Sequence, residues 1–391
     1  MSPPPFRLMV DASTLRSGGG PIIAAHELRM IHQTFGRAVE LLLVDGPTGL
    51  PLDADVAVQR LPRPSKDPAT PAGFLSWSLV EAPRLMQDAH VDAYLSFVNW
   101  LPLRLSVPAA IYVHSPYAMR LLFHGPKDFL SRLPRFALAQ LGLTKARAII
   151  VQTDAMSQDV RTAFERLGPW SAGRDVPILK MTPTGSWMET KVASPGFSAR
   201  LAADREKADC WLFYPSVPWA HKNMDGLADA IKLVAEAGVR VGLLLPAGGI
   251  TEDQLAGILA GPVLRSFGGL TQDEMAACYD FADAVIFPSL LETAGLGLVE
   301  ALARRRPLLA SDRAFVHELC GDAAILFDPR SPEDIAAKVV AFARDPDRQA
   351  SAHHRAQVWM DSGRGLTEAG WKTTFELLGL GVTRPEGAKP G

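Results

Sequence analysis

The sequence has little of what marks secreted, nucleic-acid-binding or membrane-spanning proteins. Its three cysteines, Cys210, Cys278 and Cys320, lie far apart and form neither a CxxC pair nor a metal-ligand spacing, which favours a reducing cytoplasm. A formal net charge of −2 gives no overall attraction to nucleic acid, so any anion must be bound locally. No apolar run approaches the ~18 residues of a membrane-spanning helix, and the start contains no apolar signal core. We therefore expect a cytoplasmic protein that does not span the membrane.

The composition that is present suits a globular enzyme. Of the 391 residues, 48% are hydrophobic and 21% are charged, which excludes a largely disordered chain. A chain of this length exceeds one ordinary hydrophobic core, so two domains are expected.

Short continuous apolar runs alternate with helical patterns in both halves of the chain. Such runs are typical of buried parallel strands in βαβ units. In the first half they cover 6–11, 39–44, 92–97, 109–114, 146–152 and 176–185. In the second half they cover 210–215, 240–246, 263–268, 284–289, 307–311 and 323–327. The pattern predicts an α/β fold of two Rossmann-like, doubly wound domains that face each other across a cleft.

Changes in composition suggest where the domains end. We expect a first domain over 1–190, a polar linker over 191–207 that is interrupted by Gly and Pro, and a second domain over 208–365. A C-terminal helix over 366–381 is expected to pack back on the first domain, and 382–391 to form a flexible tail.

Ligands of open α/β sheets bind at the carboxyl ends of strands, so the turns that follow the strands are the candidate sites. The first such turn carries Gly18, Gly19 and Gly20 just before a helical pattern. Glycines there let backbone N–H groups approach an anion closely. The turn is not a dinucleotide fingerprint, because Ile23 stands where a third glycine would be needed. A plain flexible turn is an equal alternative.

The second turn, after 210–215, places His221, Lys222 and Asn223 at the start of a helical pattern. The Lys222 ammonium and the helix dipole are then both able to face an anion. In the alternative interpretation, His221 and Asn223 cap the helix and Lys222 is solvated.

The third turn, after 284–289, carries two glutamates eight residues apart, Glu292 in a loop and Glu300 in the helix that follows. Because a carboxylate accepts two hydrogen bonds, it matches a vicinal diol, and the glycines between the two residues expose backbone N–H groups. A fourth candidate, His114, ends a first-domain strand. A lone strand-end histidine is more often a structural residue.

Together these segments resemble glycosyltransferase family 4, the retaining enzymes of GT-B type. The segment "LLETAGLGLVEALARRRPLLASD" is similar to the family's E-x7-E segment, and "HELCGDAAILFDPRSPEDIAAKV" is similar to its continuation. "YPSVPWAHKNMDGLADAI" resembles the branch with a His-Lys-Asn turn. The likeness covers most of the chain and is strongest over about 210–340.

The resemblance implies a nucleotide-diphosphate sugar on the second domain, with Lys222 at the diphosphate, Glu300 at the ribose hydroxyls and Glu292 at the sugar. The implied donor-binding residues are Gly19, Gly20, His221, Lys222, Asn223, Glu292, Thr293, Ala294, Gly295, Leu296 and Glu300. Gly18 and His114 are implied at the acceptor, and Lys222, Glu292 and His114 in catalysis. No metal or other cofactor is implied.

The chain also departs from the family pattern. The family's usual phosphate-binding arginine corresponds to Val217 here, and Thr293 and Ala294 replace a usual Gly-Phe pair in the expected sugar pocket. The identity of the donor sugar is therefore not inherited from the motif. Two DxD strings, 53–55 and 345–347, fall in predicted loops away from the nucleotide turns, and we interpret them as accidental.

The function expected from the resemblance is retaining transfer of a sugar to a hydroxyl acceptor, in particular a lipid-linked or growing polysaccharide of the bacterial envelope. A phosphorylase, a sugar epimerase of the same architecture, or a non-catalytic sugar-nucleotide-binding protein remain alternatives. The expected partners are the donor and a glycan or glycolipid, without nucleic acid. The oligomeric state stays open.

Residues 117–147 form a basic and apolar stretch with six Lys or Arg residues against one acid, Asp128, a local charge of +5. An ordinary amphipathic helix pair with a solvated basic rim explains it equally well. In the functional interpretation the stretch contacts an anionic membrane, because each basic residue near such a surface contributes about 1 kcal/mol. The protein would then be peripheral on the inner face of the plasma membrane.

If 117–147 contacts a membrane, the protein should co-sediment with anionic liposomes at low salt and largely dissociate at high salt. The screening length falls from about 10 Å at 0.1 M salt to about 3 Å at 1 M, whereas apolar insertion by Phe129 and Phe136 should resist salt. Arg132→Glu combined with Arg135→Glu changes the local charge to +1 and should abolish binding. Equal binding to neutral and anionic liposomes, or binding to neither, would contradict the prediction.

Overall fold

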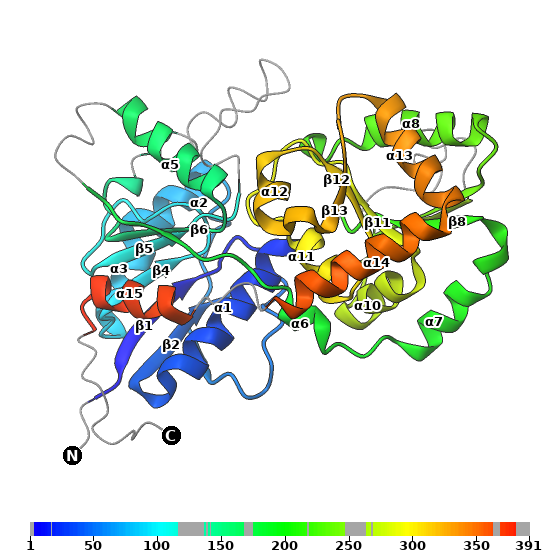
Figure 1. Cartoon of the computed structure of the whole chain (residues 1–391). Helices are drawn as coiled ribbons and strands as arrows, with labels where there is room; N and C mark the ends of the chain where they lie inside the picture. Colours follow the sequence, from blue (N-terminus) through cyan, green and yellow to red (C-terminus); the bar gives the residue numbers. More distant parts are fainter. Residues whose placement is uncertain are drawn as a thin grey trace, which may run out of the picture. The chain divides into compact units, whose positions relative to one another are not determined.

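The computed structural model describes residues 4–16, 18–115, 137, 140, 142–167, 175–216, 219–246, 263–266, 269–362 and 368–380. Most of the basic stretch 117–147, and Val217, lie outside these residues. The chain divides into two compact units, the first formed by 1–182 with 366–391 and the second by 183–365 (Figure 1).

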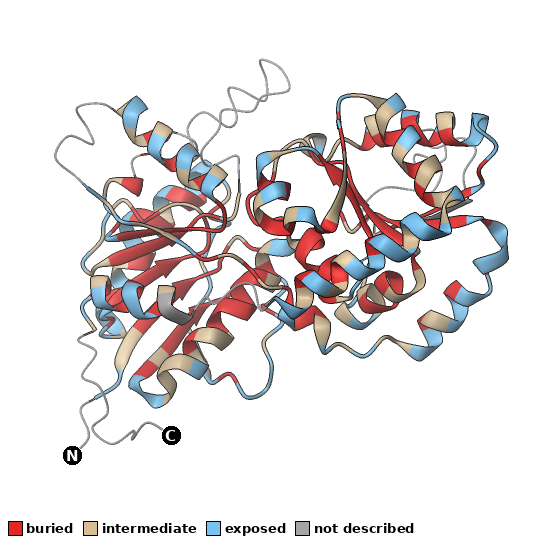
Figure 2. Ribbon diagram, viewed as in Figure 1, coloured by how far each residue is buried: buried red, intermediate tan, exposed pale blue. Residues whose placement is uncertain are grey.

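The first unit contains a seven-stranded parallel sheet in the order β3-β2-β1-β4-β5-β6-β7. Its strands are β1 (Phe6–Asp11), β2 (Val39–Val44), β3 (Val58–Arg60), β4 (Ala93–Ser96), β5 (Ala109–Tyr112), β6 (Ala148–Val151) and β7 (Ile178–Lys180). The longest register runs from Phe6 opposite Val39 to Asp11 opposite Val44. Every residue of β4, β5 and β6 is buried, because helices cover both faces of a parallel sheet (Figure 2).

The second unit repeats this arrangement with a six-stranded parallel sheet in the order β10-β9-β8-β11-β12-β13. Its strands are β8 (Cys210–Phe213), β9 (Val241–Leu245), β10 (Val263–Ser266), β11 (Ala284–Phe287), β12 (Leu308–Ser311) and β13 (Ala324–Phe327). In both units the first strand lies inside the sheet, and the strand order reverses beside it. This reversal is where ligands of such sheets bind.

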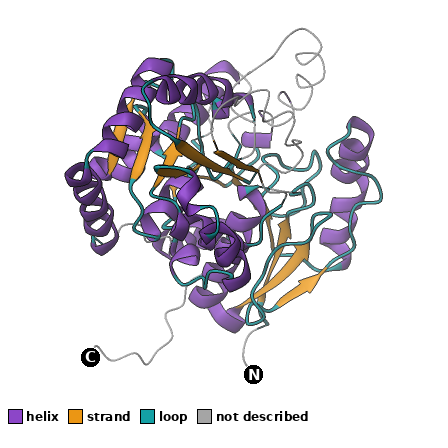
Figure 3. Cartoon of the chain, turned by 90° about the vertical axis from the view of Figure 1, so that its right-hand side faces the viewer, coloured by secondary structure: helices purple, strands orange, loops and turns teal. Residues whose placement is uncertain are grey.

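Helices flank the strands of each sheet (Figure 3). Those of the first unit include α1 (Gly19–Phe35), α2 (Pro71–Ser76), the π-helical turn η2 (Trp77–Glu81), α3 (Ala82–Asp88), α5 (Asp154–Leu167) and α15 (Glu368–Leu378). Those of the second unit include α6 (Ser186–Glu189), α7 (Pro195–Ala202), η6 (Ala220–Lys222), α8 (Met224–Glu236), α10 (Gln272–Phe281), α11 (Leu296–Ala303), α12 (Ala314–Cys320), α13 (Pro332–Arg344) and α14 (Pro346–Asp361). No helix within the described ranges is long and apolar enough to cross a bilayer.

The predicted fold class, two Rossmann-like α/β domains, is confirmed, and the apolar runs correspond to strands. Two features differ from expectation. The short edge strand β3 had no apolar run to reveal it. Residues 191–207, expected as a linker, contain α7, which packs on α10 and buries Phe197 and Leu201. Buried apolar side chains, rather than Gly and Pro content, decide whether such a segment joins a core.

The C-terminal helix α15 packs against α1 within the first unit. The contact includes the rings of Phe35 and Phe375, whose centroids lie 4.3 Å apart. At its centre is Glu27 of α1, which is fully buried and accepts hydrogen bonds from Trp371 Nε1 (2.7 Å) and Tyr112 Oη (3.0 Å). Burial raises the pKa of Glu27 to about 7, and the two hydrogen bonds oppose this rise.

The pKa of Glu27 is raised from 4.5 to about 7. Between these two pH values Glu27 is therefore protonated in the folded chain but ionised in the unfolded chain. The resulting stabilisation is complete below pH 4.5 and disappears as the pH rises through 7. We expect the free energy of unfolding of the first unit to fall between pH 4.5 and pH 8, by up to about 3 kcal/mol, relative to Glu27→Gln. Urea unfolding followed by pulsed hydrogen–deuterium exchange measures this unit separately.

The matched control is Glu165→Gln, which changes an exposed glutamate on α5 of the same unit. This variant should keep the pH dependence of the wild type. If Glu27→Gln keeps it too, Glu27 is not the group that titrates.

Candidate functional site

Two of the predicted turns meet at the strand-order reversal of the second sheet. Strand β8 pairs in parallel with β11, with Phe213 opposite Val285. Their carboxyl ends therefore lie at the same sheet edge, and residues 214–216 and 219–223, described in the turn after β8, lie next to the loop over 288–295. The fold alone brings these segments together, about 70 residues apart in sequence.

Buried hydrogen bonds hold the two segments against each other. Backbone N–H of Leu290 donates to the carbonyl oxygen of His221 (2.8 Å). The hydroxyl of the buried Tyr214 donates to the carbonyl oxygen of Lys222 (2.6 Å) and lies 3.3 Å from Ser289 Oγ. Since unpaired polar groups are costly in the interior, these bonds fix the position of both segments.

Lys222 and Glu292 form an ion pair where the segments meet. Lys222 Nζ lies 2.6 Å from Glu292 Oε1, and the side chains are only 15% and 9% exposed. The ammonium also lies 5.7 Å from the centre of the Phe287 ring. The pair presents a cation and a carboxylate side by side, which suits a ligand with both anionic and hydroxyl groups.

The residues around Lys222 shape the start of α8. Asn223 has a left-handed backbone (φ 56°) and makes no side-chain cap to the helix. Its amide donates instead to the carbonyl oxygen of Pro329 (2.6 Å). Asn223 thus occupies the N-cap position of α8, but its side chain connects the turn to the end of β13 instead of capping the helix. His221 is half-buried within η6.

Glycines bring α11 close to the ends of β8 and β11. Gly295, the N-cap of α11, has φ 52°, and a side chain there would lie 2.7 Å from Leu319 Cδ1. At Gly297 a Cβ would lie 2.7 Å from Pro215 Cγ and 2.8 Å from the Phe287 ring. Only glycine permits this close packing. The neighbouring Thr293 and Ala294 are buried and Leu296 is half-buried.

Glu300 is buried and already hydrogen-bonded. Its Oε1 accepts from Trp187 Nε1 (2.8 Å) and its Oε2 from Tyr279 Oη (2.8 Å). Burial raises its pKa, and the two hydrogen bonds oppose that rise. No local spacing in the sequence signals Trp187 or Tyr279, because they lie 113 and 21 residues from Glu300.

The first unit brings its own candidates together. A Cβ on Gly20 would lie 3.6 Å from His114 Cε1, so Gly20 and His114 are neighbours. Gly18 has φ 75° and Gly19 begins α1. His114 Nε2 donates to the Phe97 carbonyl, an acceptor only, and burial lowers the pKa of His114. A neutral imidazole with its Nε2 proton engaged suits a positioning group.

The two DxD strings have structural partners. Asp53 forms an ion pair with Arg29. The Asp345 carboxylate caps α14 by accepting from the backbone N–H groups of Asp347 and Arg348, each at 3.0 Å. In the part of the chain that the structure describes, no group of three or more His, Cys, Asp or Glu residues is placed to hold a metal ion.

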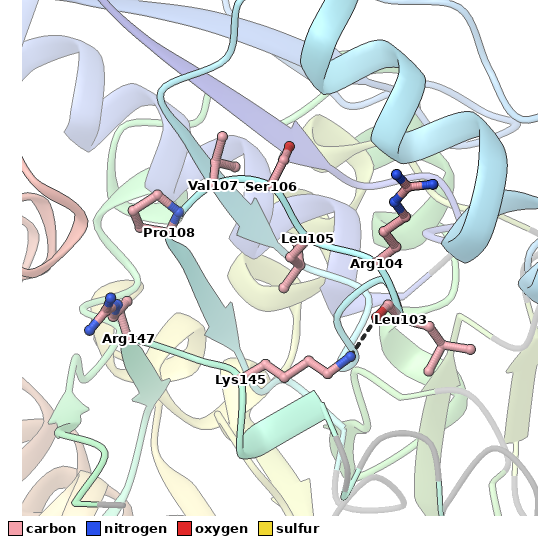
Figure 4. A pocket seen from close by; sticks show the side chains of 8 residues that line it. All are labelled: Leu103, Arg104, Leu105, Ser106, Val107, Pro108, Lys145 and Arg147. Carbon is pink, nitrogen blue, oxygen red and sulfur yellow. Dashed lines mark hydrogen bonds between the residues drawn. The ribbon is translucent and has the colours of Figure 1, made fainter.

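A basic pocket lies elsewhere in the first unit, where β5 and β6 begin (Figure 4). It has a volume of about 560 Å³, and Arg104, Lys145 and Arg147 are among its lining residues. Lys145 Nζ donates to the Leu103 carbonyl (2.5 Å). The pocket is at the amino ends of the strands, so it is not part of the candidate site.

The match to a known protein family lies within the second unit. Residues 210–345 match the family model for group 1 glycosyl transferases. The O-antigen chain mannosyltransferase B of Escherichia coli is 28% identical over 155 residues, which is 38% of each chain. The chain thus spans well under half of this relative's length.

Solved structures match nearly the whole chain. Sucrose-phosphate synthase from Thermosynechococcus elongatus superposes with a TM-score of 0.68 at 14% identity, over 95% of this chain and 98% of that one. Anabaena Alr3699/HepE, determined in complex with UDP and glucose, gives a TM-score of 0.64 at 15% identity, over 95% and 99%. At these identities the likeness establishes the fold, which is GT-B.

The ion pair Lys222–Glu292 makes a testable contribution to stability. Lys222→Met or Glu292→Gln leaves one charge largely buried without its partner, so each should destabilise the second unit, and the double variant should recover part of the loss. We expect a coupling energy of about 1–3 kcal/mol from urea unfolding of the four proteins.

The control is the exposed pair Lys232–Asp229 on α8, with N–O distance 2.9 Å and side chains 47% and 60% exposed. A cycle with Lys232→Met and Asp229→Asn should give about 0.5 kcal/mol or less. Equal coupling in the two cycles would mean that burial does not strengthen the Lys222–Glu292 pair.

Proposed function

We propose that this chain, which carries a group 1 glycosyltransferase domain and has the GT-B fold, transfers a sugar from a nucleotide-diphosphate sugar to a hydroxyl acceptor with retention of configuration. The observation that supports this most is the meeting of Lys222 and Glu292 at the strand-order reversal. A largely buried cation beside a carboxylate complements both parts of a sugar diphosphate, the negatively charged diphosphate and the hydroxyl groups of the sugar.

Each group of the donor has a counterpart in the second unit. The diphosphate carries the negative charge that Lys222 complements, and the sugar hydroxyls are donors for Glu292. The two ribose hydroxyls are donors for the carboxylate of Glu300. His221, Asn223 and the 293–296 backbone complete the proposed donor site.

In the reaction, the bond between the anomeric carbon and the bridging phosphate oxygen breaks, and its electron pair stays on the phosphate. The acceptor hydroxyl oxygen forms the new bond from the same face, and its proton passes to the leaving phosphate. The products are a glycoside and a nucleoside diphosphate. Lys222 stabilises the charge that develops on the phosphate, which lowers the barrier because the interaction strengthens in the transition state. No metal or other cofactor is part of this mechanism.

The relatives suggest the substrate class. One is named as an O-antigen chain mannosyltransferase, and a structural neighbour binds UDP and glucose. We propose a nucleotide-sugar donor and an envelope glycan or glycolipid acceptor, with Gly18 and His114 of the first unit on the acceptor side. The setting would be the cytoplasm, with peripheral contact to the inner face of the plasma membrane through 117–147.

The proposal is tested with UDP-, GDP- and ADP-sugars. The correct donor should raise the melting temperature, since a ligand stabilises by RT ln(1 + [L]/Kd). Nucleotide release should require an acceptor and persist in EDTA. Lys222→Ala should lower kcat by roughly 100-fold, more than it raises KM, because the charge it stabilises develops as the bond breaks.

Lys232→Ala, an exposed change on the same helix, should leave kinetics unchanged. Three outcomes would contradict the proposal in different ways. Donor binding without turnover across acceptors would indicate a non-catalytic sugar-nucleotide-binding protein. Loss of activity in EDTA would indicate a metal-dependent reaction. An increase of KM alone in Lys222→Ala would limit Lys222 to ground-state binding.

A further inference from the structure

The two glutamates of the candidate site are held in different ways. Glu292 is paired with a cation, Lys222. Glu300 accepts only from neutral donors, the Trp187 indole and the Tyr279 hydroxyl, and no cation among the described residues forms an ion pair with it. Its carboxyl group is therefore oriented by neutral donors, without a counter-charge among the described residues.

The three side chains come from three separate elements and are all buried. Trp187 belongs to α6, Tyr279 to α10 and Glu300 to α11, and their exposures are 6%, 0% and 4%. Each donor bonds a different carboxylate oxygen, both at 2.8 Å. Because the two hydrogen bonds come from two different helices and reach two different oxygens, they fix the plane of the Glu300 carboxylate as well as its position.

The remaining capacity of this carboxylate matches a vicinal diol. Each oxygen of an ionised carboxylate has two lone pairs, and each protein donor uses one. One acceptor position per oxygen is left, and a pair of adjacent hydroxyls supplies two donors. A side chain oriented in this way loses less rotamer freedom on binding the diol.

Other contacts also hold the segments that carry the two donors. Arg304, the C-cap residue of α11, anchors the α6 segment through Nη1, which donates to the carbonyl oxygens of Met188, Glu189 and Lys191. The Tyr279 ring packs edge-on against Phe213, with centroids 4.9 Å apart.

We propose that Trp187 and Tyr279 are positioning residues that orient the Glu300 carboxylate toward the two ribose hydroxyls of the nucleotide, and thereby set a preference for ribonucleotides over 2′-deoxyribonucleotides. This inference rests on the proposed function, because it assumes that a nucleoside diphosphate binds at Glu300.

The test compares UDP, GDP and ADP with their 2′-deoxy counterparts by calorimetry, using whichever base the wild type binds. The wild type should prefer the ribonucleotide. Tyr279→Phe keeps the ring and removes the hydroxyl, so the ribonucleotide should bind about 5- to 10-fold more weakly, the effect of about one hydrogen bond. The 2′-deoxynucleotide should bind nearly as before. Trp187→Phe should act in the same direction.

The pH dependence supplies a second readout that a purely structural role would not change. The Tyr279 hydrogen bond lowers the pKa of Glu300, so its removal raises that pKa. In Tyr279→Phe, the loss of ribonucleotide affinity on acidification should therefore begin at a higher pH. Glu300→Gln should abolish this pH dependence, and adding Tyr279→Phe to it should change the ribose preference no further.

The outcomes separate the inference from the proposed function. If the wild type binds none of the nucleoside diphosphates, the proposed function is wrong. If the wild type binds one but does not prefer ribose, or if Tyr279→Phe weakens the ribo and deoxy forms equally, only the positioning role is overturned. Hydrogen–deuterium exchange of the β8 and α10 peptides shows whether the variant keeps its packing.

Discussion

The parallel pairing of β8 with β11 is the constraint on which the candidate site depends. In a parallel sheet, every strand ends at the same edge, and connections from an inner strand leave toward opposite sides where the strand order reverses. The loops after β8 and β11 are therefore neighbours with little else between them. Lys222 and Glu292 meet because these two strands pair, and the bond from Leu290 to His221 fixes their spacing.

Burial then determines which partners the ionisable side chains at this edge need. A buried charge needs a partner, and the candidate site offers two solutions. Lys222 and Glu292 neutralise each other, so a charged ligand must compete with or share the ion pair. Among the described residues, Glu300 accepts hydrogen bonds from two neutral donors, which orient its carboxylate without a counter-charge. Two glutamates eight residues apart thus have different surroundings, since Glu292 is paired with a cation and Glu300 is bonded by neutral donors.

In the first unit, too, burial disfavours the charged form of ionisable side chains. Glu27 is buried without a cation, and burial raises its pKa to about 7. His114 is buried and neutral, because a low-dielectric setting disfavours the imidazolium. Its ring lies beside Gly20 of α1. In this unit Glu27 of α1 accepts hydrogen bonds from Tyr112 at the end of β5 and from Trp371 of the C-terminal helix, so one buried carboxylate connects three elements.

Local sequence determined the strands and the candidate turns, since runs of four to six apolar residues have few alternatives to burial in a parallel sheet. It also placed Gly295 and Gly297 in the turn between Glu292 and Glu300, whereas their close packing followed from the tertiary structure. The tertiary structure alone decided that Lys222 pairs with Glu292, that Trp187 and Tyr279 hold Glu300, and that α7 packs where a linker was expected. These contacts join residues far apart in the chain, so their formation depends on strand order and side-chain packing, which no local pattern encodes.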